Sequence, residues 1–151
     1  MRNGDKLEMQ KKLKKWTIPV LSVCLVGIFP AIFLYGNNSN EVNIQEIFEP
    51  MALFVTIALG LFAISVLLTR DPNKSSIISA LFMLVFENFA GLEGLLLALF
   101  PYLYYWHTTA IFIFILLHLA YLIYKFIPKD LAKTISSILC LVFGALCLVN
   151  I

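Results

Sequence analysis

The chain has 151 residues, of which 61% are hydrophobic and 13% are charged, and its formal net charge is +2. Soluble domains carry about 45–50% apolar and about 25% charged residues, so this composition excludes an ordinary soluble domain and indicates an integral membrane protein. Three cysteines lie in apolar runs without CxxC spacing, which argues against a disulfide framework or a zinc site. The chain also lacks nucleotide-binding, hydrolase and zinc-protease motifs and a nucleic-acid footprint. We therefore expect no cofactor, no nucleic-acid partner and no catalytic activity in this chain itself.

The N-terminal half contains two clear apolar runs. Residues 1–15 are polar and basic and predict a cytoplasmic tail. The run that follows, residues 16–35, exceeds the about 7–15 apolar residues of a signal peptide, so we predict a retained span. In the loop after it, Asn43 resembles a helix N-cap and Glu46 its return partner. A second span is predicted over residues 50–68, and in the polar turn "TRDPNKSS" after it a serine is available to cap the next helix.

The region from Ile77 to Trp106 is longer than one span needs, so the number of crossings depends on charge. If this region crosses once, all eleven Lys and Arg residues lie on the starting side of the bilayer. If it crosses twice, Lys125, Lys129 and Lys133 move to the opposite side. Because positive residues concentrate in cytoplasmic loops, the single crossing is favoured.

We therefore predict an all-α integral membrane protein, a bundle of five transmembrane helices with a cytoplasmic N-terminus and an extracytoplasmic C-terminus. The region around residues 91–106 is predicted to be an interfacial or re-entrant segment. The bundle forms a single domain over residues 16–151, with spans at about residues 16–35, 50–68, 76–93, 107–124 and 135–151.

Polar residues inside this apolar sequence are the candidates for a functional site. Glu87, Asn88 and Glu93 lie in "FENFAGLEG", near the predicted outer end of the third span. Glu87 and Asn88 either hydrogen-bond to a neighbouring helix or to water at the membrane edge, or, like Glu93, contact a lipid headgroup or substrate, because ionisable residues at membrane depth are costly and often functional. His107 and His118, at the start and middle of the fourth span, are further candidates for such contacts. A metal site built from Glu87, Glu93 and His107 lacks close ligand spacing, so none is predicted.

One long segment resembles a known family. "FLYGNNSNEVNIQEIFEPMALFVTIALGLFAISVLLTRDPNKSSIISALFMLVFEN" resembles the N-terminal multi-pass region of bacterial sulfatase-like membrane proteins, which belong to the alkaline-phosphatase superfamily. The resemblance covers about residues 25–125 and implies a five-span anchor followed by an extracytoplasmic domain that acts on phosphate or sulfate esters. Where the family is expected to have aromatic, glycine and histidine residues, this chain has "FENFAGLEG", and the nucleophile and metal ligands have no counterpart here.

Together these features predict a non-catalytic multi-pass domain of the bacterial cytoplasmic membrane that anchors and presents a lipid or glycan substrate in a sulfatase-like, envelope-modifying system. Its expected partners are membrane lipids, a downstream or separate catalytic domain, and other membrane helices in an oligomer. The alternatives are a small oligomeric transport or channel subunit and a structural partner of another membrane protein. The first hypothesis predicts a polar groove, open to the outer leaflet, near Glu87 and Glu93. The second predicts polar residues converging on one axis, and the third a lipid-facing stripe such as Gly91 and Gly94.

Overall fold

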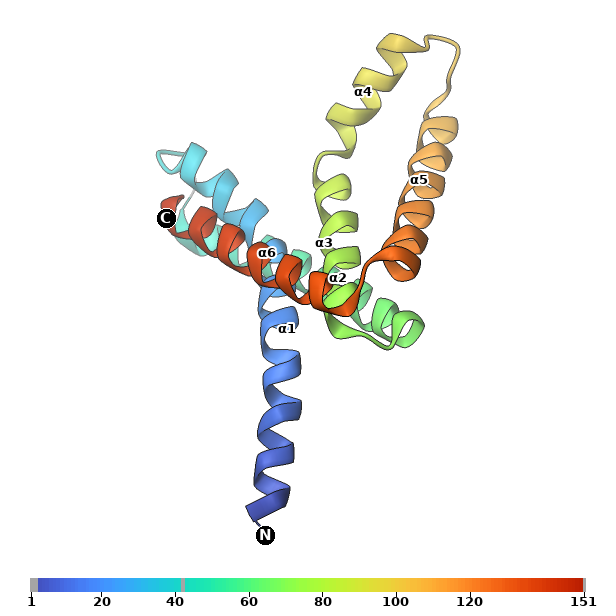
Figure 1. Ribbon diagram of the computed structural model, residues 1–151. Helices are drawn as coiled ribbons and strands as arrows, with labels where there is room; N and C mark the ends of the chain where they lie inside the picture. The colour runs from blue at the N-terminus through green and yellow to red at the C-terminus, as the bar shows by residue number, and fades with distance from the viewer. Residues whose placement is uncertain (1–2, 42, 151) are drawn as a thin grey trace.

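The computed structural model describes residues 3–41 and 43–150, and the two ends of the chain, which include Met1 and Arg2 of the predicted tail and Ile151 of the predicted fifth span, lie outside it. The described residues form helices and contain no strand, which confirms the predicted all-α fold. The helices (Figure 1) are α1 (Asn3–Asn38), the 3-10 helix η1 (Ile44–Ile47), α2 (Phe48–Thr69), α3 (Pro72–Glu87), α4 (Phe89–Leu99), α5 (Tyr105–Phe126) and α6 (Lys129–Val149).

The helices have the length and hydropathy of a membrane bundle. Helices α3 and α4 are long and apolar enough to cross a membrane only when they are taken together, and they are bent by 66° at their junction. Counting this pair as one span gives five, in agreement with the predicted bundle. The third span, predicted as continuous over residues 76–93, is however broken at Asn88. Four segments of the described chain are each long and apolar enough to cross a membrane alone: Lys15–Asn38, Ile44–Thr69, Tyr105–Phe126 and Lys129–Val149.

Contacts at the two ends of the bundle show that α1 and α6 run in the same direction. At one end, Lys15 of α1 and Lys133 of α6 line the same cavity. At the other end, a Cβ atom built on Gly36 would lie 2.7 Å from the carbonyl oxygen of Asn150. Lys74 at the start of α3 contacts Tyr124 near the end of α5, and Glu93 of α4 contacts Thr108 at the start of α5, so α5 runs back along α3 and α4. This arrangement is compatible with a single crossing by α3 and α4, which stays a prediction.

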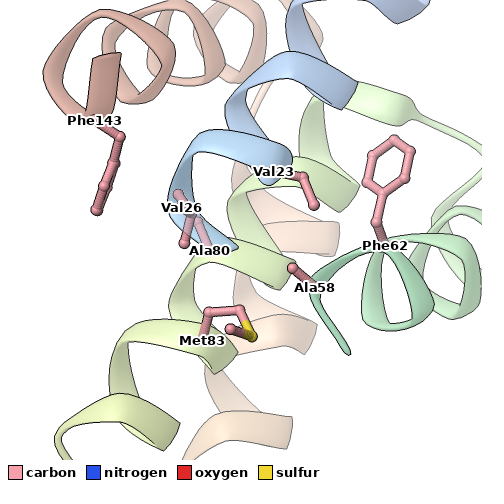
Figure 2. Packing of buried hydrophobic residues seen from close by; sticks show 7 residues of the cluster. All are labelled: Val23, Val26, Ala58, Phe62, Ala80, Met83 and Phe143. Carbon is pink, nitrogen blue, oxygen red and sulfur yellow. The ribbon is translucent and has the colours of Figure 1, made fainter. Parts of the chain in front are cut away.

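The hydrophobic core lies where four helices meet. Figure 2 shows the cluster from close by, with two residues each from α1, α2 and α3 and one from α6. Lipid tails are as apolar as the side chains, so packing between these helices depends on close fit rather than on exclusion of water. Gly27 of α1 provides such a fit, because a Cβ atom there would lie 3.0 Å from the Cα atom of Val55 in α2. The members of the cluster are Val23, Val26, Ala58, Phe62, Ala80, Met83 and Phe143.

Small polar residues bring α3 close to its neighbours. Ser75, Ser76 and Ser79 of α3 are completely buried, and so is Ser136 of α6. The Ser76 hydroxyl donates a hydrogen bond to Oγ of Ser136 at 2.9 Å, which joins α3 to α6 within the apolar interior. Small residues at helix interfaces let the backbones approach, and hydrogen bonds across such interfaces stabilise them. The central position of α3 in the bundle follows from this face of serines.

The turn between α2 and α3 is determined by its own sequence. Arg70 ends α2 in the left-handed conformation, with φ at 54°. Asp71 then caps α3, since its Oδ1 accepts hydrogen bonds from the N–H groups of Asn73 (2.9 Å) and Lys74 (3.4 Å). Pro72 occupies the first turn, where its missing N–H group is harmless. The helix therefore begins before the serines of this turn, and the expectation that one of them caps it was wrong.

Helices α4 and α5 form a hairpin that extends away from the other helices (Figure 1). The packing of α5 is mainly against α3 and α4. Leu116 and Thr108 are buried, whereas most of the other α5 side chains remain exposed or half-buried. Residues 91–106, predicted as an interfacial or re-entrant segment, are divided among α4, a turn at residues 100–104 and the start of α5. The hairpin leaves much of the apolar surface of α5 without a protein neighbour among the described residues.

Candidate functional site

The bend between α3 and α4 contains two of the predicted site residues. Asn88 is exposed and closes α3, and its Nδ2 donates a hydrogen bond to the carbonyl oxygen of Leu84 at 2.8 Å. Glu87 is half-buried, and its Oε1 is buried without a hydrogen-bond partner among the described residues. Because the helix direction changes here, Glu87 does not share one helical face with Gly91 and Gly94. Both glycines face open space, so they are not an interface within the described chain.

Glu93 has a structural contact that the sequence did not predict. Its Oε1 lies 2.6 Å from the hydroxyl of Thr108, which is completely buried in the first turn of α5. The same hydroxyl lies 2.7 Å from the carbonyl oxygen of Tyr105, so it can donate its proton to either acceptor. A hydrogen bond to a charged group contributes about 1.5–3 kcal/mol. Glu93 therefore joins α4 to α5.

The two histidines have local contacts within α5 and its cap. Nδ1 of His107 accepts a hydrogen bond from the backbone N–H of Tyr104 at 3.1 Å, and its ring stacks on Trp106 with centroids 3.5 Å apart. His107 thus belongs to the cap of α5. His118 is exposed and stacks on Phe114 one turn earlier in the same helix. Within the described chain, no three His, Cys, Asp or Glu side chains are placed to hold a metal ion. The predicted site residues do not converge on one site.

A different feature, which we call the apolar groove, runs along α3 between α2 and α5. It consists of two adjoining cavities of 510 and 400 Å³, and Leu61 and Phe82 line both of them. One part extends to Thr69 and Tyr124, and the other reaches the bend at Phe89. The remaining lining is almost entirely aliphatic and aromatic. The groove exists because α2 and α5 both pack on α3 and leave a gap between each other.

One end of the apolar groove adjoins a third cavity, of 420 Å³, which we call the basic mouth. Lys74, Lys125 and Lys129 line it. Thr69 and Tyr124 line both the basic mouth and the groove, so the two adjoin at these residues.

Two of the three amino groups at the mouth, those of Lys74 and Lys125, contact neutral groups. Nζ of Lys74 donates a hydrogen bond to the carbonyl oxygen of Tyr124 at 2.6 Å, and it also lies 5.7 Å from the centre of that ring. Nζ of Lys125 lies 5.5 Å from the ring of Tyr121 and 5.2 Å from that of Phe126. These contacts position the lysines without neutralising their charge.

Asp71 contributes a carboxylate to the lining of the basic mouth, and this carboxylate already accepts hydrogen bonds from the backbone of α3. Only 7% of the residue is exposed, and its Oδ1 accepts two N–H groups at the start of α3. The positive end of the helix dipole further offsets a carboxylate at this position. The mouth therefore presents a net positive charge, and together with the groove it forms an amphipathic site.

A second basic cavity, of 390 Å³, lies at the same end of the bundle. Lys15, Arg70 and Lys133 line it together with Asp130. Asp71 and Lys129 line it as well as the mouth. Basic residues from α1, the α2–α3 turn, α5 and α6 are thus gathered at one end, as the single-crossing topology predicts.

Comparison with known proteins leaves the site to be interpreted on its own geometry. No protein-family model, curated protein or solved structure matches the chain. The resemblance to sulfatase-like membrane regions therefore stays a prediction. Chemically, the arrangement suits an amphiphile whose polar part is negatively charged, because an apolar groove adjoins a cavity lined by three lysines.

Proposed function

We propose that this chain is a non-catalytic membrane module that binds a lipid in the apolar groove and presents it to a partner enzyme. The observation that supports the proposal is the apolar groove along α3, whose two adjoining cavities share the lining residues Leu61 and Phe82. In this proposal the partner belongs to an envelope-modifying system of the sulfatase-like kind, in the bacterial cytoplasmic membrane. The basic end of the bundle faces the cytoplasm, as the concentration of positive residues in cytoplasmic loops supports.

The dimensions of the groove suit a hydrocarbon chain. Along α5 it extends from Thr109 to Tyr124, which corresponds to about 22 Å at about 1.5 Å per residue. One leaflet contributes half of a hydrocarbon core that is about 30 Å thick, or about 15 Å. Each cavity also falls within the about 300–1,000 Å³ typical of small-molecule sites. A chain that enters at one end can therefore remain in the groove through its own leaflet.

The proposal is tested by filling the groove. Ala120 lines it on α5, whereas Ala63 on α2 is exposed and lines none of the four cavities. Ala120→Trp and Ala63→Trp add the same bulk at these two places. We expect native mass spectrometry of the protein, purified in a mild detergent, to show retained lipid for the wild type and Ala63→Trp but much less for Ala120→Trp. Circular dichroism and size-exclusion chromatography check that both variants fold.

Equal lipid retention by Ala120→Trp and Ala63→Trp would contradict lipid binding in the groove. If Ala120→Trp instead changed the oligomeric state and left lipid retention intact, the groove would be a helix-binding surface. That result would favour the alternative function of an oligomeric subunit or structural partner, which the exposed side of α5 also allows.

A further inference from the structure

The proposed function does not specify the chemical class of the lipid. The charge of the basic mouth indicates which class would bind. Three lysines from α3, α5 and α6 surround the opening through which the polar end of a bound lipid would reach the interface. At the other end of the apolar groove, the described residues that line it are uncharged and include Phe86, Phe89 and Thr109. The groove is therefore polarised, and a lipid in it has one preferred orientation.

We propose that the groove binds an anionic glycerophospholipid, with an acyl chain along α3 and its phosphate-bearing headgroup in the basic mouth formed by Lys74, Lys125 and Lys129. This proposal rests on the proposed function and names the class of lipid for the same site. Charge complementarity selects this occupant over an apolar helix, because a helix entering the membrane would bring no negative charge to the mouth. The headgroup lies in the leaflet at the basic end of the bundle, so a partner enzyme that acts on it works at the cytoplasmic face and not in the extracytoplasmic domain that the sulfatase-like resemblance implies.

The structure also explains why the mouth suits a phosphate group. The amino groups of Lys74 and Lys125 are held by a carbonyl oxygen and by aromatic rings, and these contacts leave their positive charge available to an anion. Lysine presents a compact, strongly hydrated charge with three donors, which matches a phosphate at an interface. Asp71 caps α3, and its single negative charge leaves the three lysines of the mouth in excess.

The test compares two lipids with the same acyl chains and different charge. The full chain is purified in detergent and mixed with phosphatidylglycerol or phosphatidylcholine, and bound lipid is measured by native mass spectrometry. We expect the wild type to prefer phosphatidylglycerol. Each lysine near a membrane surface contributes about fivefold in binding of an anionic lipid, the equivalent of about 1 kcal/mol. The double variant Lys74→Gln with Lys125→Gln is therefore expected to lose roughly 25-fold of the preference, mainly through weaker binding of phosphatidylglycerol.

Matched variants separate a specific headgroup site from general surface charge. Lys133→Gln removes the same charge from the second basic cavity, and we expect it to leave the preference almost unchanged. Lys125→Gln alone keeps the Lys74 hydrogen bond to α5, so it tests the mouth even if the double variant folds poorly. Lys125→Arg keeps the charge and should retain the preference.

Several results would overturn the proposal, and they differ from those that contradict the proposed function. Equal binding of the two lipids by the wild type, both blocked by Ala120→Trp, would refute the headgroup assignment and leave lipid binding intact. An equal loss of preference in Lys133→Gln would show a general charge effect. Displacement of the lipid by inorganic phosphate alone would identify a free-phosphate site. If neither lipid bound to the wild type, the proposed function itself would fail.

Discussion

The close approach of α1 and α2 at Gly27 gives a quantitative prediction about stability. A Cβ atom at Gly27 would lie 3.0 Å from the Cα atom of Val55 and 3.1 Å from the carbonyl oxygen of Phe54. These neighbours are backbone atoms of α2, so they cannot yield as the end of a flexible side chain could. Gly27→Ala therefore forces the helices apart, and overpacking of this kind costs about 1–3 kcal/mol. Alanine in a helix gains about 0.8–1.0 kcal/mol over glycine, which offsets part of that cost.

Gly60 provides the control, because it lies in α2 and a Cβ atom added to it would meet no described atom within 4 Å. Gly60→Ala has the helical gain without the clash, so the two variants should differ in free energy of unfolding by about 1–3 kcal/mol. Thermal unfolding in detergent, followed by circular dichroism, measures this difference. If Gly27→Ala proved as stable as Gly60→Ala, the close packing of α1 on α2 would be refuted.

Three further predictions concern the turn, the bend and the topology. Asp71→Ala should lower the free energy of unfolding by about 1 kcal/mol through loss of the α3 cap, whereas Asp71→Asn should retain the cap and the stability. An equal loss of stability in both variants would count against the cap. Glu87→Leu removes a buried oxygen that has no partner among the described residues, a defect that costs about 1–3 kcal/mol. We therefore expect this variant to melt no lower than the wild type, and a lower melting temperature would show that Glu87 has a stabilising contact. In a cysteine-free background, Lys129→Cys should resist an impermeant maleimide in intact cells while Asn40→Cys reacts; labelling of Lys129→Cys would overturn the five-span topology.

Hydropathy was sufficient to predict the four helices that are long and apolar enough to span a membrane alone, and their order. Long apolar runs coincide with α1, α2, α5 and α6, because a bilayer requires such lengths. Asn43 was also correctly predicted as a cap, since its side chain accepts a hydrogen bond from the N–H of Gln45 at 3.3 Å. Patterns within a short stretch of sequence therefore predicted the features that depend on neighbouring residues alone, namely apolar helices and a helix cap.

The bend and the groove depend on contacts that one sequence does not display. The residues on both sides of Asn88 are equally apolar, so hydropathy alone predicts a continuous helix there. The groove arises because α2 and α5 both pack on α3, which is a property of the assembled bundle. Thr108 was overlooked because a threonine beside aromatic residues resembles an ordinary interfacial residue, and only the fold brings it to Glu93.

Helix α5 is attached at its two ends by polar contacts, Lys74 with Tyr124 at one end and Glu93 with Thr108 at the other. The four-helix core lies away from α5, which contributes no residue to it. Swinging the hairpin outward thus requires the Lys74–Tyr124 contact and the packing of α5 on α3 to break, whereas the Glu93–Thr108 contact lies within the hairpin and the core stays intact. We expect the exchange rate of a bound molecule to follow the viscosity and lateral pressure of the surrounding bilayer, and to depend little on the aqueous phase.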